Sequence, residues 1–516
     1  MSNMLPPAPV GPAGLTAEQV VAVARHGAPV ALTEPALAAM TASRRQVEAL
    51  ATAETPAYGV STGFGAMATR HIPPDRREAL QRSLIRSHAA GSGPEVEREV
   101  VRALMLLRLR TLASGRTGAR PEVGRALAGM LNAGLTPVVR EYGSLGCSGD
   151  LAPLAHVALA LIGEGEVRDH SGELRPAAGA LAEAGLHPVQ LASKEGLALI
   201  NGTDGMLGML LLACADLRRL VATADLAAAM SVEALLGTDR VFAADLTALR
   251  PHPGQADSAA NLRALLAGSA IMASHRGPDC TRVQDAYSLR CAPQVAGAVR
   301  DTLAHAEAVA GRELAASIDN PVVLPDGRVE SCGNFHGAPV GYVLDFLAIA
   351  AADLASIAER RTDRMLDVAR SAGLPAFLAD DPGVDSGHMI AQYTQAAIVS
   401  ELKRLAVPAS VDSIPSSAMQ EDHVSMGWGA ARKLRRSVDG LTQVLAVEIL
   451  TAARALELRA PLRPAPATAA AVAALRRRVA GPGPDRYLAP ELAACVALVT
   501  DGTLLLAAES VAGALR

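Results

Sequence analysis

The hydrophobic positions of this chain recur mostly at the spacing of α-helices. From Ala17 to Leu50 and from Glu95 to Ala113, apolar residues return every three or four positions, which places them on one helix face. The segment from Pro339 to Arg360 is apolar on nearly every face, and such a helix must be buried on several sides. Similar patterns predict further long helices at Val295 to Ser317, Met389 to Ala406 and Ser437 to Leu458. The pattern therefore predicts an all-α protein with a bundle of long helices.

Composition supports this prediction. Half of the residues are hydrophobic but only 2% are aromatic, and alanine and leucine dominate, which favours closely packed helices over sheets. The proline-rich residues 1–12 predict a short flexible arm, because they lack the basic start and apolar run of a signal peptide. The longest uncharged apolar stretch, Gly205 to Ala215, is about half of the roughly 20 residues that span a bilayer. We expect no membrane span and a cytoplasmic location.

Charge and cysteine content exclude several classes of partner. The chain of 516 residues has 48 basic and 52 acidic side chains and a net charge of -4, without a long run of one sign. Nothing in this balance indicates binding to nucleic acid or to an anionic membrane. The six cysteines show no C-x-x-C spacing and no clustering with histidines, which argues against a metal site and against a disulfide scaffold. Small molecules are therefore the expected partners.

The strongest chemical signal is the tripeptide Cys147-Ser148-Gly149, in the loop from Gly143 to Pro153. Glycine has no side chain to block the tight turn in which the Gly149 nitrogen attacks the Cys147 carbonyl. Loss of that carbonyl oxygen as water, and of the Ser148 hydroxyl as a second water, leaves a methylidene on a five-membered imidazolone. The methylidene accepts nucleophiles. Taken alone, the segment also fits a Gly/Ser loop that enters a helix capped by Asp150.

The motif Gly-Ser-Leu-Gly-Cys-Ser-Gly-Asp-Leu-Ala-Pro-Leu at residues 143–154 resembles the cofactor-forming loop of the aromatic amino-acid ammonia-lyases. Their prosthetic group is 4-methylidene-imidazole-5-one (MIO). The resemblance runs from Tyr58 to beyond Trp428 and rests on several separate motifs. It implies an almost entirely helical fold, with a loop-rich cofactor-bearing domain at residues 13–200 and a long-helix bundle domain at 201–516. It also implies a homotetramer in which each active site takes residues from three subunits.

The resemblance implies roles for several residues. Tyr58 resembles the tyrosine favoured as the base for the β-proton, and Tyr287 a second tyrosine beside the cofactor. Arg290 resembles the arginine that pairs with the substrate carboxylate, which a planar guanidinium binds through both oxygens. Asn201 resembles the asparagine that supports the imidazolone and the substrate amine. Two further residues match positions that line the pocket: Gln284 and Phe335. The structural alternatives are packing for the tyrosines and a surface salt bridge for the arginine.

Two positions indicate the substrate. Ser87-His88 matches a pair that reads Ser-His in family members acting on histidine, His-Leu in those acting on tyrosine and Phe-Leu in those acting on phenylalanine. Glu421 matches a position where the histidine enzymes carry glutamate and the others usually carry glutamine. A carboxylate and an imidazole can bind both nitrogens of a substrate imidazole, whereas a phenyl ring would leave the carboxylate buried and unpaired. The pair favours L-histidine as the substrate, with elimination of ammonia to give trans-urocanate, the first step of histidine degradation. The structural alternative is that Glu421 caps a helix and His88 is packed in the core.

The chain departs from the family pattern at three positions. Cys147, Ser61 and Ala286 replace the usual alanine, asparagine and proline. Cyclisation uses only the backbone carbonyl of Cys147, so the thiol should not prevent cofactor formation; sensitivity of this thiol to oxidation is a hypothesis. The alternatives are a phenylalanine or tyrosine ammonia-lyase, an aminomutase with the same cofactor, and a non-catalytic helical oligomer. The sequence leaves open which tyrosine is the base and whether the substrate amine or ring adds to the cofactor.

Overall fold

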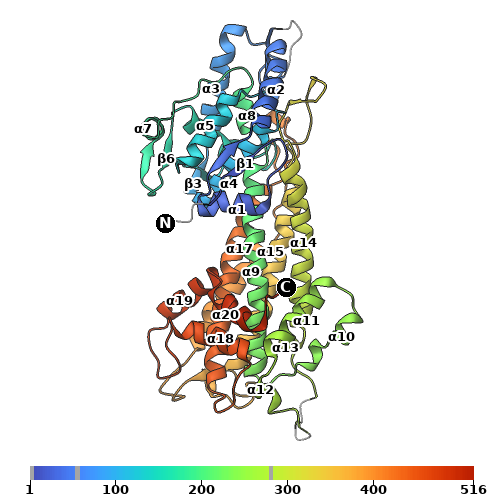
Figure 1. The fold of residues 1–516 in the computed structure, drawn as a ribbon, viewed down its shortest axis with the longest axis vertical. Coiled ribbons are helices and arrows are strands. Elements are labelled where there is room, and N and C mark those ends of the chain that lie inside the picture. The colour runs from blue at the N-terminus through green and yellow to red at the C-terminus, as the bar shows by residue number, and fades with distance from the viewer. Residues whose placement is uncertain (1–4, 53–57, 278–279, 281–282) are drawn as a thin grey trace. The chain divides into compact units, whose positions relative to one another are not determined.

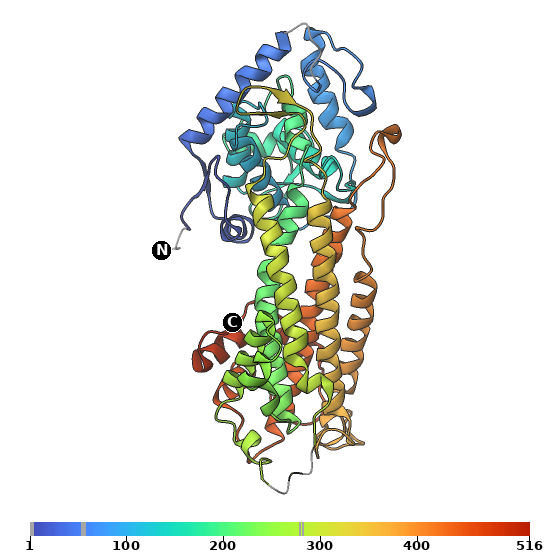
Figure 2. The same cartoon turned by 90° about the vertical axis from the view of Figure 1, so that its right-hand side faces the viewer.

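The computed structural model describes residues 5–52, 58–277, 280 and 283–516, and the chain is mostly helical (Figure 1, Figure 2). The predicted all-α class is confirmed. The chain forms two compact units, each built from segments that lie far apart in the sequence. The first unit comprises Met1–Leu212, Glu307–Asp345 and Pro408–Arg432, and the second comprises Ala213–Ala306, Phe346–Val407 and Lys433–Arg516. The sequence predicted two folding domains, at residues 13–200 and 201–516. Because a compact unit is not the same as a folding domain, that division stays a prediction.

The first unit contains short helices and small sheets. Its helices are α1 (Ala17–His26), α2 (Glu34–Thr52), α3 (Arg77–His88), α4 (Arg98–Ala113), α5 (Pro121–Asn132), α6 (Leu151–Leu161), α7 (Ala177–Glu183) and α8 (Glu195–Ile200). Its strands are β1 (Ala8–Val10), β2 (Val30–Leu32), β3 (Ser92–Glu95), β4 (Thr136–Pro137), β5 (Arg140–Tyr142), β6 (Glu166–Arg168), β7 (Leu174–Pro176), β8 (Val322–Val323) and β9 (Val329–Glu330). The strands pair as β1-β2, β3-β5, β4-β6-β7 and β8-β9.

The N-terminal part differs from the sequence prediction in two respects. The helical pattern from Ala17 to Leu50 is broken, because Gly27 takes up a left-handed conformation that ends α1, and β2 separates α1 from α2. In addition, residues 8–10 of the expected flexible arm form strand β1, which pairs in parallel with β2. The side chains of β1 alternate between buried and exposed, so burial as well as backbone pairing fixes this segment.

Apart from the helix at Asp204–Ala234, which the sequence analysis did not predict, the long helices occur where the pattern predicted them, with shifted ends. Four of them extend across the boundaries between the two units in the sequence: α9 (Asp204–Ala234), α14 (Ala292–Ala315), α15 (Ala338–Leu366) and α17 (Gly427–Glu457). The second unit also contains α10 (Ala244–Ala248), α11 (Pro253–Leu266), α12 (Ala270–Ala273), α13 (Tyr287–Arg290), α16 (Met389–Leu405), α18 (Pro466–Arg476), α19 (Ala489–Thr500) and α20 (Thr503–Ala512). Helix α17 begins before the expected Ser437, and α18 begins inside the Pro/Ala-rich segment Arg459 to Ala470 that reads as a linker in the sequence.

Buried polar contacts tie the long helices together within the second unit, where they lie side by side (Figure 1, Figure 2). Arg361 of α15 forms an ion pair with Glu448 of α17, and the two side chains are 1% and 0% exposed. The hydroxyl of Ser231 in α9 donates to the same carboxylate at 2.7 Å. The amide of Gln395 in α16 donates to the carbonyl of Val444 in α17 at 2.8 Å. The predicted bundle of long helices is therefore confirmed for this unit.

Helix α15 is long and apolar enough to cross a membrane, with a mean hydropathy of 1.7 over its most apolar 18 residues. The bent pair α19 and α20 passes the same test of length and composition as one broken span. In α15, 61% of the apolar window is buried inside the structure. A core helix of a globular protein has the same composition, so one such helix is weak evidence for a membrane span.

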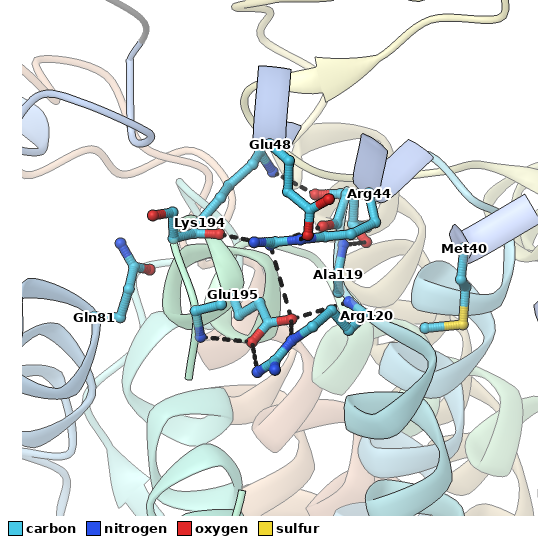
Figure 3. Close-up of polar contacts among 12 residues, drawn as sticks. Met40, Arg44, Glu48, Gln81, Ala119, Arg120, Lys194 and Glu195 are labelled. Atoms are coloured by element: carbon cyan, nitrogen blue, oxygen red, sulfur yellow. Dashed lines mark hydrogen bonds and ion pairs between the residues drawn. The ribbon is translucent and has the colours of Figure 1, made fainter. Parts of the chain in front are cut away.

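A buried ionic cluster fixes the start of helix α8 in the first unit (Figure 3). The Glu195 carboxylate is fully buried and accepts hydrogen bonds from Nε and Nη2 of Arg120, both at 2.8 Å. The backbone N–H of Ala192 donates to the same carboxylate at 2.7 Å. Arg44 of α2 lies 3.9 Å from Glu195 and donates to the carbonyl of Ser193 at 3.0 Å. Helices α2, α5 and α8 are thereby joined, and α8 leads directly to Asn201.

Candidate active site

The tripeptide Cys147-Ser148-Gly149 lies in a tight turn before α6. Ser148 and Gly149 have φ values of 55° and 75°, in the left-handed region that favours glycine. A Cβ atom at residue 149 would lie 2.0 Å from the carbonyl oxygen of Gly202. That oxygen also accepts a hydrogen bond from the backbone N–H of Asp150 at 2.7 Å. Only glycine fits at position 149, as the sequence argument for cyclisation requires.

Asp150 anchors this turn to helix α9. Its carboxylate accepts hydrogen bonds from the backbone N–H groups of Gly205 and Met206 at 2.8 and 2.9 Å, and from the Ser144 hydroxyl at 2.8 Å. In the structural alternative to cofactor formation, Asp150 would cap the helix that follows it, but its side chain caps α9 instead and makes no capping bond to α6. Burial raises the pKa of Asp150 to about 7, and the backbone and hydroxyl donors oppose that shift.

Two distant loops bind the other side of the turn. The backbone N–H of Gly337 donates to the carbonyl of Gly146 at 3.0 Å, and the Ser425 hydroxyl donates to the same carbonyl at 2.7 Å. The backbone N–H of Met426 donates to the carbonyl of Leu145 at 2.8 Å. These bonds hold the loop that contains Phe335 and the loop that contains Glu421 against the loop of the tripeptide.

Glu421 contacts the reactive serine directly. The Ser148 hydroxyl donates to Glu421 Oε1 at 3.1 Å, and the Ser416 hydroxyl donates to Oε2 at 3.0 Å. Backbone hydrogen bonds in both directions between Ser416 and Glu421 fix the base of this loop. The carboxylate is therefore held beside the position where the cofactor is expected to form, and it does not cap a helix.

His88 is the last residue of α3, and its Nδ1 lies 2.9 Å from the carbonyl of Leu84 and 3.0 Å from the Ser87 hydroxyl. Because a carbonyl only accepts, the bond to Leu84 requires the proton on Nδ1. Burial lowers the pKa of His88, while the bond to Leu84 and the negative charge of Glu421 oppose that shift. The neutral ring therefore keeps the Nε2 lone pair available to a donor, and it lies within electrostatic reach of Glu421.

Tyr58 contacts Phe64 and Gly65 in the first unit. The rings of Tyr58 and Phe64 meet edge to face with centroids 6.5 Å apart. The backbone N–H of Gly65 donates to the phenolic oxygen of Tyr58 at 3.1 Å. This bond holds the phenolic oxygen of Tyr58 against the backbone of Gly65.

Asn201 follows α8 and presents an unpaired oxygen. Its side chain is 4% exposed, and its Nδ2 donates to the carbonyl of Asn320 at 3.0 Å. Its Oδ1 is buried and has no hydrogen-bond partner among the residues that the structure describes. A buried acceptor without a partner is costly, so this atom is suited to a ligand that brings a donor.

Tyr287 and Arg290 lie in α13 of the second unit, and Gln284 lies in the loop just before this helix. The Arg290 guanidinium stacks over the Tyr287 ring at 4.7 Å from its centroid, and Tyr287 is 72% exposed. The Nε atom of Arg290 is buried without a hydrogen-bond partner in the described part of the chain. The structure thus divides the predicted site residues into two groups: this one, and the group of Tyr58, His88, Ser148, Asn201, Phe335 and Glu421 in the first unit.

Sequence reasoning missed Asn320 and its neighbour Asp319, which contact Asn201 and the buried Lys194. The atom of Asn320 that contacts Asn201 is a backbone carbonyl, and every residue type supplies one, so no residue pattern could reveal it. Within the residues that the structure describes, no group of three or more His, Cys, Asp or Glu side chains is arranged to hold a metal ion.

Comparisons with known proteins give one consistent result. Residues 15–477 match the family described as aromatic amino acid lyase. A histidine ammonia-lyase of Streptomyces coelicolor is 68% identical over 98% of this chain and 99% of its own length. Among solved structures, a tyrosine aminomutase from Streptomyces globisporus has a TM-score of 0.93 at 40% identity, covering 99% of this chain and 100% of that one. A histidine ammonia-lyase from Trypanosoma cruzi has a TM-score of 0.89 at 37% identity, covering 97% and 95%.

Proposed function

The chain belongs to the aromatic amino acid lyase family, and on that premise we propose that it is a histidine ammonia-lyase that converts L-histidine to trans-urocanate and ammonia. One observation carries the choice of histidine. The Glu421 carboxylate binds the Ser148 hydroxyl, and His88, a neutral imidazole with an available Nε2, lies within its electrostatic reach. Either acceptor can bind an N–H of the substrate imidazole, whereas a phenyl ring brings no donor to the Glu421 carboxylate.

We further propose that MIO forms from Cys147, Ser148 and Gly149. The left-handed turn and the absence of space for a Cβ at residue 149 fit a backbone that closes on itself. The unpaired Oδ1 of Asn201 suits the substrate amine, which brings a donor to the site. When formed, MIO supplies an electrophile that turns the substrate nitrogen into a better leaving group.

The remaining roles follow from chemistry. Removal of ammonia requires a base for the β-proton, and Tyr58 is the candidate from its match to the family's tyrosine, with its oxygen held by the Gly65 N–H. Asn201 Oδ1 accepts a hydrogen bond from the substrate amine, and Phe335 packs beside the ring. Arg290 binds the substrate carboxylate through a guanidinium whose Nε has no partner in the described chain, with Gln284 and Tyr287 beside it.

We propose a homotetramer in which neighbouring copies share each active site. The support is the exposure of Tyr287, 72% in the single chain, at a position where a site residue should be covered. Co-expression of a Tyr58→Phe chain with an Arg290→Ala chain tests the sharing. Each variant alone should be inactive, and a mixed oligomer should regain part of the activity, because some sites then receive both intact residues. A mixture as inactive as its components would contradict shared sites.

The direct test is to incubate the purified protein with L-histidine, L-phenylalanine and L-tyrosine in parallel and to follow the near-ultraviolet absorbance of the product. Urocanate from histidine alone is the expected result. Cinnamate or coumarate would overturn the choice of substrate, and a β-amino acid product would indicate an aminomutase. If none of the three amino acids gives a product and the intact mass shows no loss of two waters, the protein is the non-catalytic oligomer.

A further inference from the structure

The orientation of the Asn201 amide is set by a backbone carbonyl. Its Nδ2 donates to the carbonyl of Asn320 at 3.0 Å. Because that carbonyl only accepts, the amide must turn its NH2 group toward Asn320 and leave Oδ1 on the opposite side. The position of the Asn320 carbonyl therefore decides that Asn201 offers an acceptor to a ligand.

A buried ion pair holds the segment that carries this carbonyl. Asp319 and Lys194 have side chains that are both 0% exposed, and Lys194 Nζ lies 2.5 Å from Asp319 Oδ2. Asp319 Oδ1 accepts from the backbone N–H of Asn320 at 2.8 Å, so the carboxylate joins the ammonium to the residue that binds Asn201. Lys194 also donates to the carbonyl of Thr117 at 2.9 Å. Burial raises the pKa of Asp319, and the positive charge of Lys194 opposes that shift.

These contacts form a closed circuit around helix α8. Lys194 immediately precedes α8, in a left-handed conformation with φ 71°, and Asn201 immediately follows it. The Asp319-Asn320 pair thus touches both ends of a helix that is only six residues long. The start of this helix is itself fixed by the Glu195 cluster, so Lys194 has little freedom to move (Figure 3).

The main chain at Asn201 has a separate support. Arg108 is fully buried, and its Nη1 donates to the carbonyls of Ala198 and Asn201 at 3.0 and 3.2 Å and lies 3.4 Å from that of Ile318. Arg108 also forms an ion pair with Asp204. Removing the Lys194-Asp319 pair should therefore release the Asn320 carbonyl and the Asn201 side chain while leaving the backbone of α8 in place.

We propose that Lys194 and Asp319 are positioning residues that set the Asn201 amide for catalysis, by fixing the Asn320 carbonyl against which that amide is oriented. The inference rests on the proposed function, because it assumes that Asn201 Oδ1 binds the substrate amine. Neither residue touches the substrate. Their effect passes through Asn201, and this separates the proposal from a role in general stability.

The test is a mutant cycle built on the neutral pair Lys194→Met with Asp319→Asn, which removes both charges at similar volume and leaves no lone buried ion. In the otherwise intact enzyme, the pair should lower kcat for L-histidine by about 10- to 100-fold, the effect of misplacing one hydrogen bond to a charged group. In an Asn201→Ala background the same pair should lower kcat by less than about 3-fold, because the group that it positions is gone. If the paired substitution lowers kcat by the same factor in the intact enzyme and in the Asn201→Ala background, the proposal is overturned.

Two further measurements separate positioning from cofactor formation and from general stability. Intact mass should show the loss of two waters in the paired variant, and its absence would overturn the proposal by assigning the pair to cofactor formation. The control pair Asp225→Asn with Arg300→Met removes another buried ion pair, 1% and 12% exposed, and should leave kcat within about 3-fold of the parent. An equal loss of kcat in this control would show a general structural effect and would also overturn the proposal.

If the double substitution Lys194→Met with Asp319→Asn prevents folding, Lys194→Gln with Asp319→Asn replaces it in the cycle, because two amides also leave no lone buried ion and can keep one hydrogen bond between the side chains. A parent enzyme that forms MIO but does not act on histidine would refute the proposed function. If the parent enzyme is active and the paired substitution lowers kcat by the same factor in both backgrounds, only the positioning role is refuted.

Discussion

The Ser148 hydroxyl donates a hydrogen bond to the Glu421 carboxylate at 3.1 Å, between residues separated by 273 positions in the sequence. The contact joins the residue expected to become the electrophile to the residue expected to select the substrate. It places two functions that the sequence suggested independently within one hydrogen bond of each other.

Replacing Glu421 by glutamine should weaken activity toward histidine. The amide keeps the shape but loses the charge that favours a bound imidazole, so kcat/KM for L-histidine should fall by about 10- to 100-fold. The control is Asp422→Asn, a neighbouring acidic residue whose side chain is exposed. Steady-state kinetics with L-histidine measure both variants, and equal losses in the two would contradict a specific role for Glu421.

Substituting Gly149 by alanine should prevent cofactor formation. The added Cβ would lie 2.0 Å from the Gly202 carbonyl oxygen, and the residue would also need a φ of 75°. We expect an intact mass without the loss of two waters, and activity at background. Gly185→Ala is the matched control, because Gly185 has a φ of 70° but nothing within 4 Å of an added Cβ. It should cost about 1–2 kcal/mol of stability and leave the mass change intact.

Replacing Cys147 by alanine should not protect the enzyme from peroxide. The thiol is 7% exposed, and burial together with the nearby negative charge of Glu421 raises the pKa of Cys147, while a backbone bond at Ser148 opposes the shift. A buried, protonated thiol reacts slowly, which argues against the hypothesis of an oxidation-sensitive site. Inactivation rates in peroxide should agree within about 2-fold between parent and Cys147→Ala. Clear protection by the substitution would restore that hypothesis. In an alkylation experiment, the reaction rate of the buried Cys147 thiol is compared with that of the exposed Cys280 thiol.

His388 should make the protein sensitive to mild acid. Burial, with the positive charge of Arg454, lowers the pKa of His388 from 6.5 to about 3. The unfolded chain gains a proton at His388 as the pH falls through 6.5, and the folded chain does not. The contribution of neutral His388 to the free energy of unfolding is therefore fully present above pH 6.5 and declines toward pH 3. Between pH 6.5 and pH 5 the free energy of unfolding should fall by about 2 kcal/mol from this residue.

Urea unfolding at several pH values measures the effect. The His388→Asn variant should lose this part of the slope, while the control His252→Asn, with a side chain that is 57% exposed, should keep it. A His388→Asn slope equal to that of the parent would show that the folded protein accepts a proton at this residue.

The sequence by itself determined the helices and the reactive tripeptide. Apolar spacing placed both ends of α14 and α16, and the start of α15, within a few residues, because helix periodicity is a local property. The same spacing could not reveal β2 inside the first predicted helix, since that strand exists only by pairing with β1. The motif around Ser148 also stood out locally, because cyclisation depends on adjacent backbone atoms.

The tertiary structure decided how these parts work together. The contact of Ser148 with Glu421, the unpaired Oδ1 of Asn201 and the buried pair of Lys194 with Asp319 all join residues far apart in the chain. Which atom of an amide faces a ligand depends on a partner that only the folded chain brings close. Residue types and their spacing carry the chemistry that is available, and hydrogen bonds and burial between distant segments fix which of it is used.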